Sequence, residues 1–195
     1  NVSKAQVEWA RARAAERSLG DRVRFVLDDY RTIDRRCDRF VSVGMLEHVG
    51  PANYRVLGDL VKRVLEPDGL ALVHSIGRSH PRPADAWIRK YIFPGGHIPS
   101  LGEMAAIFEP NRFTVLDVEN LRLHYARTCA DWLANFEAVA DRVTERFDEA
   151  FTRMWRLYLA GSSAGFRSGT LQLYQVVFAH GDSNDVPRTR NYMYP

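Results

Sequence analysis

The stretch Phe40-Val41-Ser42-Val43-Gly44-Met45-Leu46-Glu47-His48-Val49-Gly50 joins an apolar run to a glycine-bounded segment with adjacent acidic and imidazole side chains. The run over residues 40–45 predicts a strand, because nearly every position suits a buried sheet. Ligands of doubly wound sheets bind beyond the carboxyl ends of the strands, so Glu47 and His48 lie where a site is expected. From spacing alone, Glu47 could bind a cation, orient a base, accept a proton or simply cap the following helix.

Helical and strand patterns alternate on either side of this strand. Residues 4–17 predict an amphipathic helix, with Ser3 as N-cap and Gln6 at the third helical position in a capping box. The other predicted elements are strands over residues 22–27, 70–76, 113–118 and 170–179, and helices over residues 53–65, 101–108, 129–140 and 143–159. This alternation predicts an α/β domain whose mainly parallel sheet has helices on both faces, with strand 170–179 at its edge.

Two segments lack regular periodicity. Residues 77–100 contain four of the nine prolines together with Trp87, Tyr91 and Phe93. They predict a long loop with one short helix, and loops of this length usually serve a site. Residues 182–195 are polar and contain proline, so we expect a C-terminal tail after a domain over residues 1–181.

The composition restricts the class of protein. With 195 residues, 46% hydrophobic and 26% charged, the chain suits one globular domain. No apolar stretch reaches the roughly 18 to 20 residues needed to cross a bilayer. Two cysteines, Cys37 and Cys129, fit no disulfide framework or zinc motif, which favours a reducing, cytoplasmic setting. The net charge of +3 is weak evidence for attraction to nucleic acid or to an anionic lipid surface.

Several classes of site lack their usual motifs. The six histidines show no metal-ligand spacing, so we predict no metal site. Neither a Gly-x-Ser-x-Gly elbow nor a phosphate-binding Gly-x-x-x-x-Gly-Lys loop occurs, which removes support for hydrolases and nucleotide triphosphatases. The sequence also has no Gly-x-Gly-x-x-Gly after an N-terminal strand, because no predicted strand precedes the first helix.

Polar residues at the ends of the other predicted strands are further candidates. In Asp28-Asp29-Tyr30, an acid can accept from the exocyclic amine of an adenine and the aromatic ring can stack on it, or the acids can cap a helix. His74 ends an apolar strand and is either a core histidine or a catalyst. Aromatic residues at near-helical spacing in the last third indicate either core or a substrate channel: Trp132, Phe136, Phe147, Phe151, Trp155, Tyr158 and Phe166.

Taken in order, these segments resemble the cyclopropane fatty-acyl-phospholipid synthase family, relatives of the mycolic acid cyclopropane synthases, within the S-adenosylmethionine (SAM)-dependent methyltransferases. The resemblance covers residues 2–181, nearly the whole chain. The segments that carry it are Val2-Ser3-Lys4-Ala5-Gln6, Asp29-Tyr30-Arg31, residues 40–50, His74-Ser75-Ile76-Gly77, residues 87–96, Leu123-His124-Tyr125-Ala126-Arg127-Thr128 and residues 171–178. The resemblance implies a Rossmann-like methyltransferase sheet.

The resemblance also implies a reaction and its residues. Family members transfer the SAM methyl group to a cis double bond of a phospholipid acyl chain, and bicarbonate accepts the proton lost on ring closure. By resemblance, Glu47, His74 and Tyr125 hold the bicarbonate, and the backbone of Gly44 and Ile76 lines it. A buried Glu beside an anion requires protonation or hydrogen bonding to compensate the repulsion. The resemblance assigns cofactor contacts to Ser3, Gln6, Asp28, Asp29, Tyr30, Val43 and His48.

One departure from the family concerns the N-terminal side. The family's first strand with its glycine-rich loop, its acidic residue after the second strand and its bicarbonate-binding cysteine all lie before Asn1. We therefore expect a C-terminal fragment that lacks two strands between residues 22–27 and 40–45 and is inactive alone. The resemblance implies contact with unsaturated phospholipid at the inner face of the membrane rather than with nucleic acid, and it leaves a homodimer open.

Two other functions remain alternatives. A related enzyme would simply methylate the unsaturated lipid, so that the scaffold is shared and only the fate of the substrate cation differs. A truncated, non-catalytic domain would instead bind lipid or another subunit.

Overall fold

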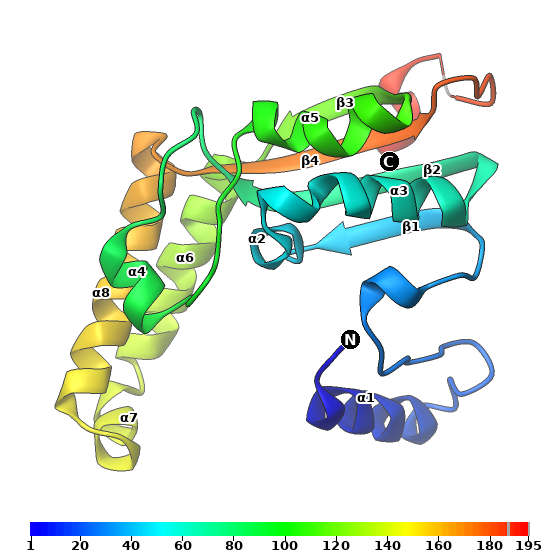
Figure 1. The fold of residues 1–195 in the computed structure, drawn as a ribbon. Coiled ribbons are helices and arrows are strands. Elements are labelled where there is room, and N and C mark those ends of the chain that lie inside the picture. The colour runs from blue at the N-terminus through cyan, green and yellow to red at the C-terminus, as the bar shows by residue number, and fades with distance from the viewer. Residues whose placement is uncertain (187, 195) are drawn as a thin grey trace. The chain divides into compact units, whose positions relative to one another are not determined.

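The computed structural model describes residues 1–186 and 188–194, and it divides into two compact units, Asn1–Arg36 and Cys37–Pro195 (Figure 1). The smaller unit contains helix α1 (Lys4–Glu16) and the 3₁₀ turn η1 (Tyr30–Thr32). Ser3 caps α1 as predicted, accepting a hydrogen bond from the Gln6 backbone N–H at 3.4 Å. The capping box is incomplete, because the Gln6 side-chain oxygen accepts from the Asn1 amide at 2.7 Å instead.

The strand predicted over residues 22–27 is wrong. The backbone there has no strand partner among the described residues of Asn1–Arg36, and a strand requires one. Two of its carbonyl groups are satisfied locally instead. The Arg11 guanidinium donates to the Phe25 oxygen at 2.8 Å, and the N-terminal ammonium donates to the Val26 oxygen at 3.1 Å. These residues therefore form an irregular segment against α1.

The larger unit is built on a four-stranded sheet of β1 (Cys37–Val43), β2 (Leu65–Gly77), β3 (Phe113–Asn120) and β4 (Gln172–His180). The strand order is β1-β2-β4-β3, with β1–β2 parallel and both pairings of β4 antiparallel. The predictions of a mainly parallel sheet and of the last strand at its edge were therefore wrong. β4 lies between β2 and β3, where an almost continuously buried strand is expected, since both of its neighbours and both faces shield it.

In the larger unit, the helices before β3 agree with the predictions except for one short helix over Leu46–Val49, which was not predicted, and the helices between β3 and β4 differ from them. These elements are α2 (Leu46–Val49), η2 (Pro51–Asn53), α3 (Tyr54–Val64), α4 (Ala86–Tyr91), α5 (Leu101–Phe108), η3 (Glu109–Asn111), α6 (Arg122–Glu137), α7 (Ala140–Arg146), α8 (Glu149–Ser168) and η4 (Arg190–Met193). The helix predicted over residues 101–108 and the short helix inside the 77–100 loop are confirmed. The two helices predicted over residues 129–140 and 143–159 are three helices with other bounds. The break before α8 comes from Asp148, whose side chain accepts from the Phe151 N–H at 2.6 Å and starts a new helix.

One face of the sheet is covered by α3 and α5 (Figure 1). The two helices contribute side chains that are at most 2% exposed, namely Tyr54, Leu57, Leu60, Val61, Met104 and Ile107. A full capping box starts α5, in which Ser100 and Glu103 each accept the other's backbone N–H. The helices approach closely at Gly58, where a methyl group would overlap the Ile107 carbonyl oxygen. This layer supplies the main core of the unit.

The opposite face is covered only in part. α6 and α8 pack against its end, where Leu173 joins Ala126, Cys129 and Phe166 in a buried cluster. Val41 and Val43 of β1 remain 65% and 64% exposed within the described residues of Cys37–Pro195. Helices therefore lie on both faces, but the β1 side of the second face is open.

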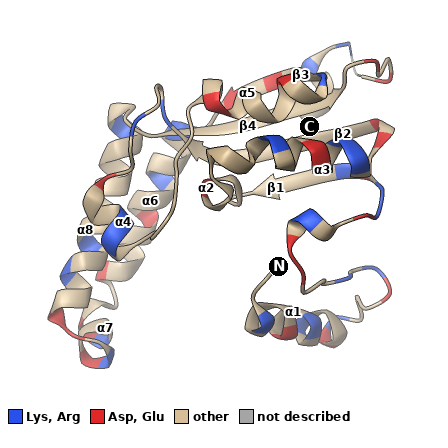
Figure 2. Cartoon of the chain, in the orientation of Figure 1, with Lys and Arg blue, Asp and Glu red and all other residues tan. Residues whose placement is uncertain are grey.

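α6 carries both basic and acidic side chains, whereas the charged side chains of α8 after Glu149 are all arginines (Figure 2). Several form exposed ion pairs, including Arg127 with Asp131 at 3.2 Å and Arg153 with Glu149 at 3.1 Å.

Within the predicted tail, Arg190 pairs with the buried Asp117 of β3, while Pro187 and Pro195 lie outside the described residues. In the part of the chain that the structure describes, no helix is both long and apolar enough to cross a membrane.

Candidate active site

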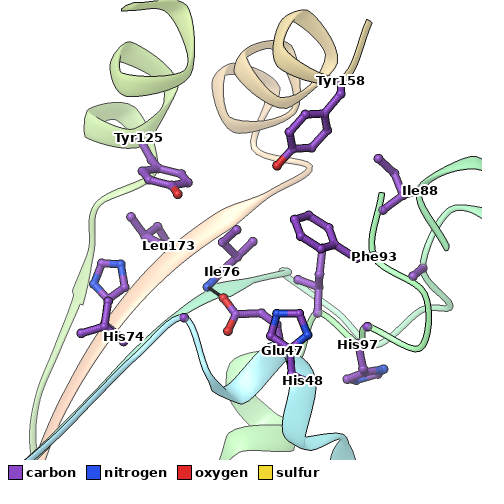
Figure 3. Close-up of a pocket in the computed structure, with 15 residues that line it drawn as sticks. Glu47, His48, His74, Ile76, Ile88, Phe93, His97, Tyr125, Tyr158 and Leu173 are labelled. Carbon is purple, nitrogen blue, oxygen red and sulfur yellow. Dashed lines mark hydrogen bonds between the residues drawn. The ribbon is translucent and has the colours of Figure 1, made fainter. Parts of the chain in front are cut away.

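A pocket of about 290 Å³ lies beyond the carboxyl ends of β1 and β2 (Figure 3). The five residues assigned to the bicarbonate site by resemblance all line it: Gly44, Glu47, His74, Ile76 and Tyr125. They come from different elements, since Glu47 lies on α2, His74 and Ile76 on β2, and Tyr125 on α6. The structure therefore brings together residues that are up to 81 positions apart in the sequence, from Gly44 to Tyr125.

Glu47 is held by one of its two carboxylate oxygens. Its Oε1 accepts a hydrogen bond from the Ile76 backbone N–H at 2.7 Å (Figure 3), whereas its Oε2 is buried without a hydrogen-bond partner. Gly44 makes the turn into α2 at φ +64°, a conformation that favours glycine. The Gly44 N–H donates to the His74 carbonyl at 3.0 Å. The N–H groups of Gly44 and Ile76 are thus both engaged within the protein, and the atom left free for a ligand is Glu47 Oε2.

His74 lies opposite Gln175 in the register of β2 and β4. Its Nδ1 is 3.1 Å from Gln175 Nε2. Burial lowers the pKa of His74, although the nearby Glu47 carboxylate opposes that shift. The ring is therefore neutral near pH 7, with one nitrogen fixed by a neighbouring strand.

Two tyrosines point their hydroxyl groups into the pocket, Tyr125 from α6 and Tyr158 from α8 (Figure 3). Burial raises the pKa of both phenols, so each remains a hydrogen-bond donor at neutral pH. The Tyr125 ring packs edge-on against Phe166, with 5.0 Å between the ring centroids. The sequence left Tyr158 undecided between core and channel, and the structure places it on the pocket wall.

The 77–100 loop supplies an apolar wall. Ile88 of α4, Phe93 and Ile98 line the pocket, and Phe93 meets Tyr158 edge-on at 6.0 Å between centroids. The loop is attached to the Glu47 main chain, because the His97 N–H donates to the Glu47 carbonyl at 2.8 Å. The sequence predicted a loop serving a site and named Phe93 among its aromatic residues, but it did not single out Ile88 and Ile98, whose signal is only their place in a proline-rich segment.

The residues assigned to the cofactor fall in both units. Val43 and His48 line the pocket in Cys37–Pro195, whereas Ser3, Gln6, Asp28, Asp29 and Tyr30 belong to Asn1–Arg36. Asp29 caps η1 and binds Arg31 through both carboxylate oxygens, at 2.9 and 2.7 Å. This hydrogen bonding to Arg31 lowers the pKa of Asp29 to about 2. Among the described residues, no group of three His, Cys, Asp or Glu side chains is arranged to hold a metal ion, and Cys37 and Cys129 are both free thiols.

Comparison with known families identifies the relatives of this chain. The profile described as mycolic acid cyclopropane synthetase matches residues 1–176. The chain belongs to this family. The resemblance of the motifs over residues 40–50 and 74–77 to cyclopropane synthases is thereby confirmed.

Individual members of the mycolic acid cyclopropane synthetase family are similar to this chain in sequence and in structure. The cyclopropane-fatty-acyl-phospholipid synthase of Escherichia coli strain K12 is 41% identical over 172 residues, which cover 88% of this chain and 45% of that protein. A probable fatty acid methyltransferase of Pseudomonas putida is 37% identical over 99% of this chain and 52% of its own length. The mycolic acid cyclopropane synthase CmaA1, solved with SAH and CTAB, superposes with a TM-score of 0.81 at 29% identity, covering 91% of this chain and 67% of that one.

The relatives are longer than this chain and have a similar fold. The chain spans about half the length of the curated relatives that it matches. Its mixed α/β fold with a four-stranded sheet is similar to the fold of SAM-dependent methyltransferases.

Proposed function

We propose that residues 1–181 form the C-terminal part of a cyclopropane fatty-acyl-phospholipid synthase. The enzyme would transfer a methylene group from SAM to the cis double bond of a phospholipid acyl chain. Family membership and the name of the Escherichia coli relative support this reaction class. The observation that carries the proposal is the buried, unpartnered Glu47 Oε2 in a pocket that also presents His74 and Tyr125.

An unpartnered buried carboxylate oxygen is costly, so a ligand that donates a hydrogen bond to it is favoured. Bicarbonate meets this requirement because it carries one O–H donor besides its negatively charged oxygens. Glu47 Oε2 would accept that O–H, while Tyr125 and His74 would donate to the anionic oxygens. Once bound, bicarbonate supplies the base that takes the proton lost on ring closure. The protein's task is to hold that base in one orientation, which Glu47 does through its fixed bond to Ile76 N–H.

The substrate side of the proposal rests on the apolar wall. Ile88, Phe93, Ile98 and Leu173 present hydrocarbon surface to the pocket, which suits an acyl chain and excludes water from a cationic carbon. A phospholipid substrate implies that the enzyme works at a membrane surface. We propose peripheral contact with the inner leaflet from the cytoplasm, and we treat self-association into a homodimer as part of the same proposal.

For the cofactor, we propose that Val43 and His48 contribute the pocket side of the SAM site. By family resemblance, Ser3, Gln6, Asp28, Asp29 and Tyr30 contribute the adenosine and methionine contacts. SAM supplies the methyl group when it is bound. Asp29 fits the role of a hydrogen-bond acceptor, because its hydrogen bonds to Arg31 lower its pKa and keep it ionised at neutral pH.

We further propose that the first two strands of the methyltransferase sheet belong to the portion of the relatives that this chain does not match. Support comes from β1, whose Val41 and Val43 are 65% and 64% exposed although its apolar sequence is typical of an interior strand. A preceding strand and helix would cover them. In this proposal residues 182–195 follow the domain as a tail.

The test uses the natural gene product that contains these residues. It is expressed in an Escherichia coli strain without its own synthase, fed methionine labelled in the methyl group, and the phospholipid acyl chains are analysed by mass spectrometry and NMR. The proposal requires a labelled ring methylene at the former double bond, and the Glu47→Gln variant serves as the matched control. Absence of both labelled product and SAM binding would instead favour the non-catalytic lipid- or partner-binding domain.

A second candidate function is methylation without ring closure. The 37% identity to a probable fatty acid methyltransferase favours it as the alternative. The same experiment separates the two, because that reaction would place the label in a methyl branch.

A further inference from the structure

Gln175 lies outside the assigned site and contacts it through His74. It lies on β4 as the register partner of His74, and partners in an antiparallel pair project from the same face. Its Nε2 lies 3.1 Å from His74 Nδ1, and both side chains are partly buried. The two strands, rather than a mobile loop, therefore set the distance between the amide and the ring.

The chemistry of the two groups determines the direction of this hydrogen bond. An amide nitrogen can only donate, so His74 Nδ1 must accept. A neutral imidazole carries one proton, and when Nδ1 accepts, that proton resides on Nε2. Because burial keeps His74 neutral, the ring has one acceptor that Gln175 uses and one donor that remains for the pocket.

We propose that Gln175 is a positioning residue that fixes His74 in the tautomer with its proton on Nε2. The inference rests on the proposed function for its purpose, since a donor at Nε2 is what an anion in the pocket needs. In this tautomer Nε2 has no lone pair with which to accept a proton from the substrate. His74 thus binds the anion and leaves proton acceptance to it.

The alternative outcome is the other tautomer of His74, in which Nδ1 carries the proton and donates it to Gln175. If the Gln175 amide were rotated by half a turn, its oxygen would accept from Nδ1–H. Nε2 would then be an acceptor, and His74 could serve as a base itself. A direct measurement of the protonated nitrogen distinguishes these two states.

The experiment measures the tautomer by long-range ¹H–¹⁵N correlation NMR at neutral pH on the ¹⁵N-histidine-labelled natural gene product that contains these residues. The His74 signals are assigned by their loss in His74→Gln. We expect the wild-type ring to be protonated at Nε2 and unprotonated at Nδ1. We expect Gln175→Glu, whose carboxylate only accepts, to place a proton on Nδ1, and Gln175→Leu to leave a mixture.

The matched control is Gln172→Glu, the same substitution three residues earlier in β4, where the side chain bonds Asn120 and Gly169 instead. It is expected to leave the His74 tautomer unchanged. A wild-type ring protonated at Nδ1, or a tautomer unaffected by Gln175→Glu in a chain with a native amide spectrum, would overturn the inference.

A second measurement separates this inference from the proposed function. Titration with ¹³C-bicarbonate is followed by NMR for the wild type and Gln175→Leu, and the variant is expected to bind about twofold more weakly, because only about half of its His74 rings carry the proton on Nε2. If the wild type does not bind bicarbonate while its tautomer is as stated, the bicarbonate proposal fails and the tautomer assignment stands. Equal affinity in both proteins would show that Gln175 does not serve anion binding.

Discussion

Replacing Gly58 by alanine is expected to destabilise the chain, although the same change usually stabilises a helix. Gly58 lies in the middle of α3, where alanine would gain about 1 kcal/mol in helix propensity. Its added methyl group would overlap the Ile107 carbonyl oxygen and lie 2.5 Å from Asn111 Nδ2. The first of these atoms is backbone of α5, so the clash can be relieved only by moving the two helices apart.

The expected change in the free energy of unfolding is the difference between the gain in helix propensity and the cost of the clash. Overpacking of a close contact costs about 2 to 3 kcal/mol, so Gly58→Ala is expected to lose about 1 to 2 kcal/mol net. Gly161 provides the matched control, because it lies inside α8 and the added carbon has no atom within 4 Å apart from its chain neighbours and the backbone of its own helix. Gly161→Ala is expected to gain about 0.5 to 1 kcal/mol.

The assay is urea unfolding followed by far-ultraviolet circular dichroism. With a slope of about 2 kcal/mol per M, the midpoints of the two variants are expected to differ by about 1 M, on opposite sides of the wild type. The reasoning is refuted if Gly58→Ala unfolds at or above the wild-type midpoint. It is also refuted if Gly161→Ala loses as much stability as Gly58→Ala, since the effect would then not come from the α3–α5 contact.

Three further predictions concern the site and its support. In the natural gene product, Glu47→Gln is expected to reduce ring formation by about 10² to 10³ while leaving SAM affinity nearly unchanged. Asp29→Ala is expected to weaken SAM binding more than it reduces ring formation. Product analysis measures ring formation, and calorimetric titration measures SAM affinity. Burial lowers the folded-state pKa of His74 below its unfolded value of 6.5. The free energy of unfolding is therefore expected to fall as the pH falls from 6.5 toward the folded-state pKa, because the unfolded chain binds the proton more readily. Urea titrations at several pH values measure this dependence, and His74→Gln is expected to flatten it. Ser100→Ala removes one half of the α5 capping box and is expected to lower the free energy of unfolding by about 0.5 to 2 kcal/mol, whereas Ser100→Thr should retain most of it.

The elements that could be predicted from sequence are those whose signals are local. The helix over residues 101–108 was correct because Ser100 and Glu103 form its capping box within four residues. The loop with a short helix over residues 77–100 was correct because prolines interrupt both periodicities there. The strand over 40–45 was close to β1, since the apolar run itself makes such a strand visible in the sequence.

The failures depend on partners distant in sequence. Residues 22–27 have a strand pattern, but without a pairing strand their carbonyls bind Arg11 and the N-terminus. The position of β4 between β2 and β3 is a matter of strand order, which periodicity does not encode. A buried, apolar strand is compatible with either parallel or antiparallel neighbours, so the direction of pairing was also hidden.

The candidate site also contains some residues that local sequence patterns reveal and others that they do not. Glu47 and His74 were visible because each polar residue interrupts an apolar run at a strand end. Tyr125 came only from family resemblance, since a tyrosine on a helix has no distinguishing local pattern. Gln175 was not found at all, because its importance arises from the register that places it opposite His74.

The hydrogen bond from His97 N–H to the Glu47 carbonyl constrains how this family can vary in length. Two residues later, the Pro99 carbonyl accepts from Arg78 N–H at 2.8 Å, so the loop is anchored twice in quick succession. An insertion between these anchors would pull on α2 and displace Glu47. The stretch around Ser79 to Pro81 is exposed and can absorb added residues without that effect. Natural insertions among homologues are therefore expected before α4 and not between His97 and Pro99.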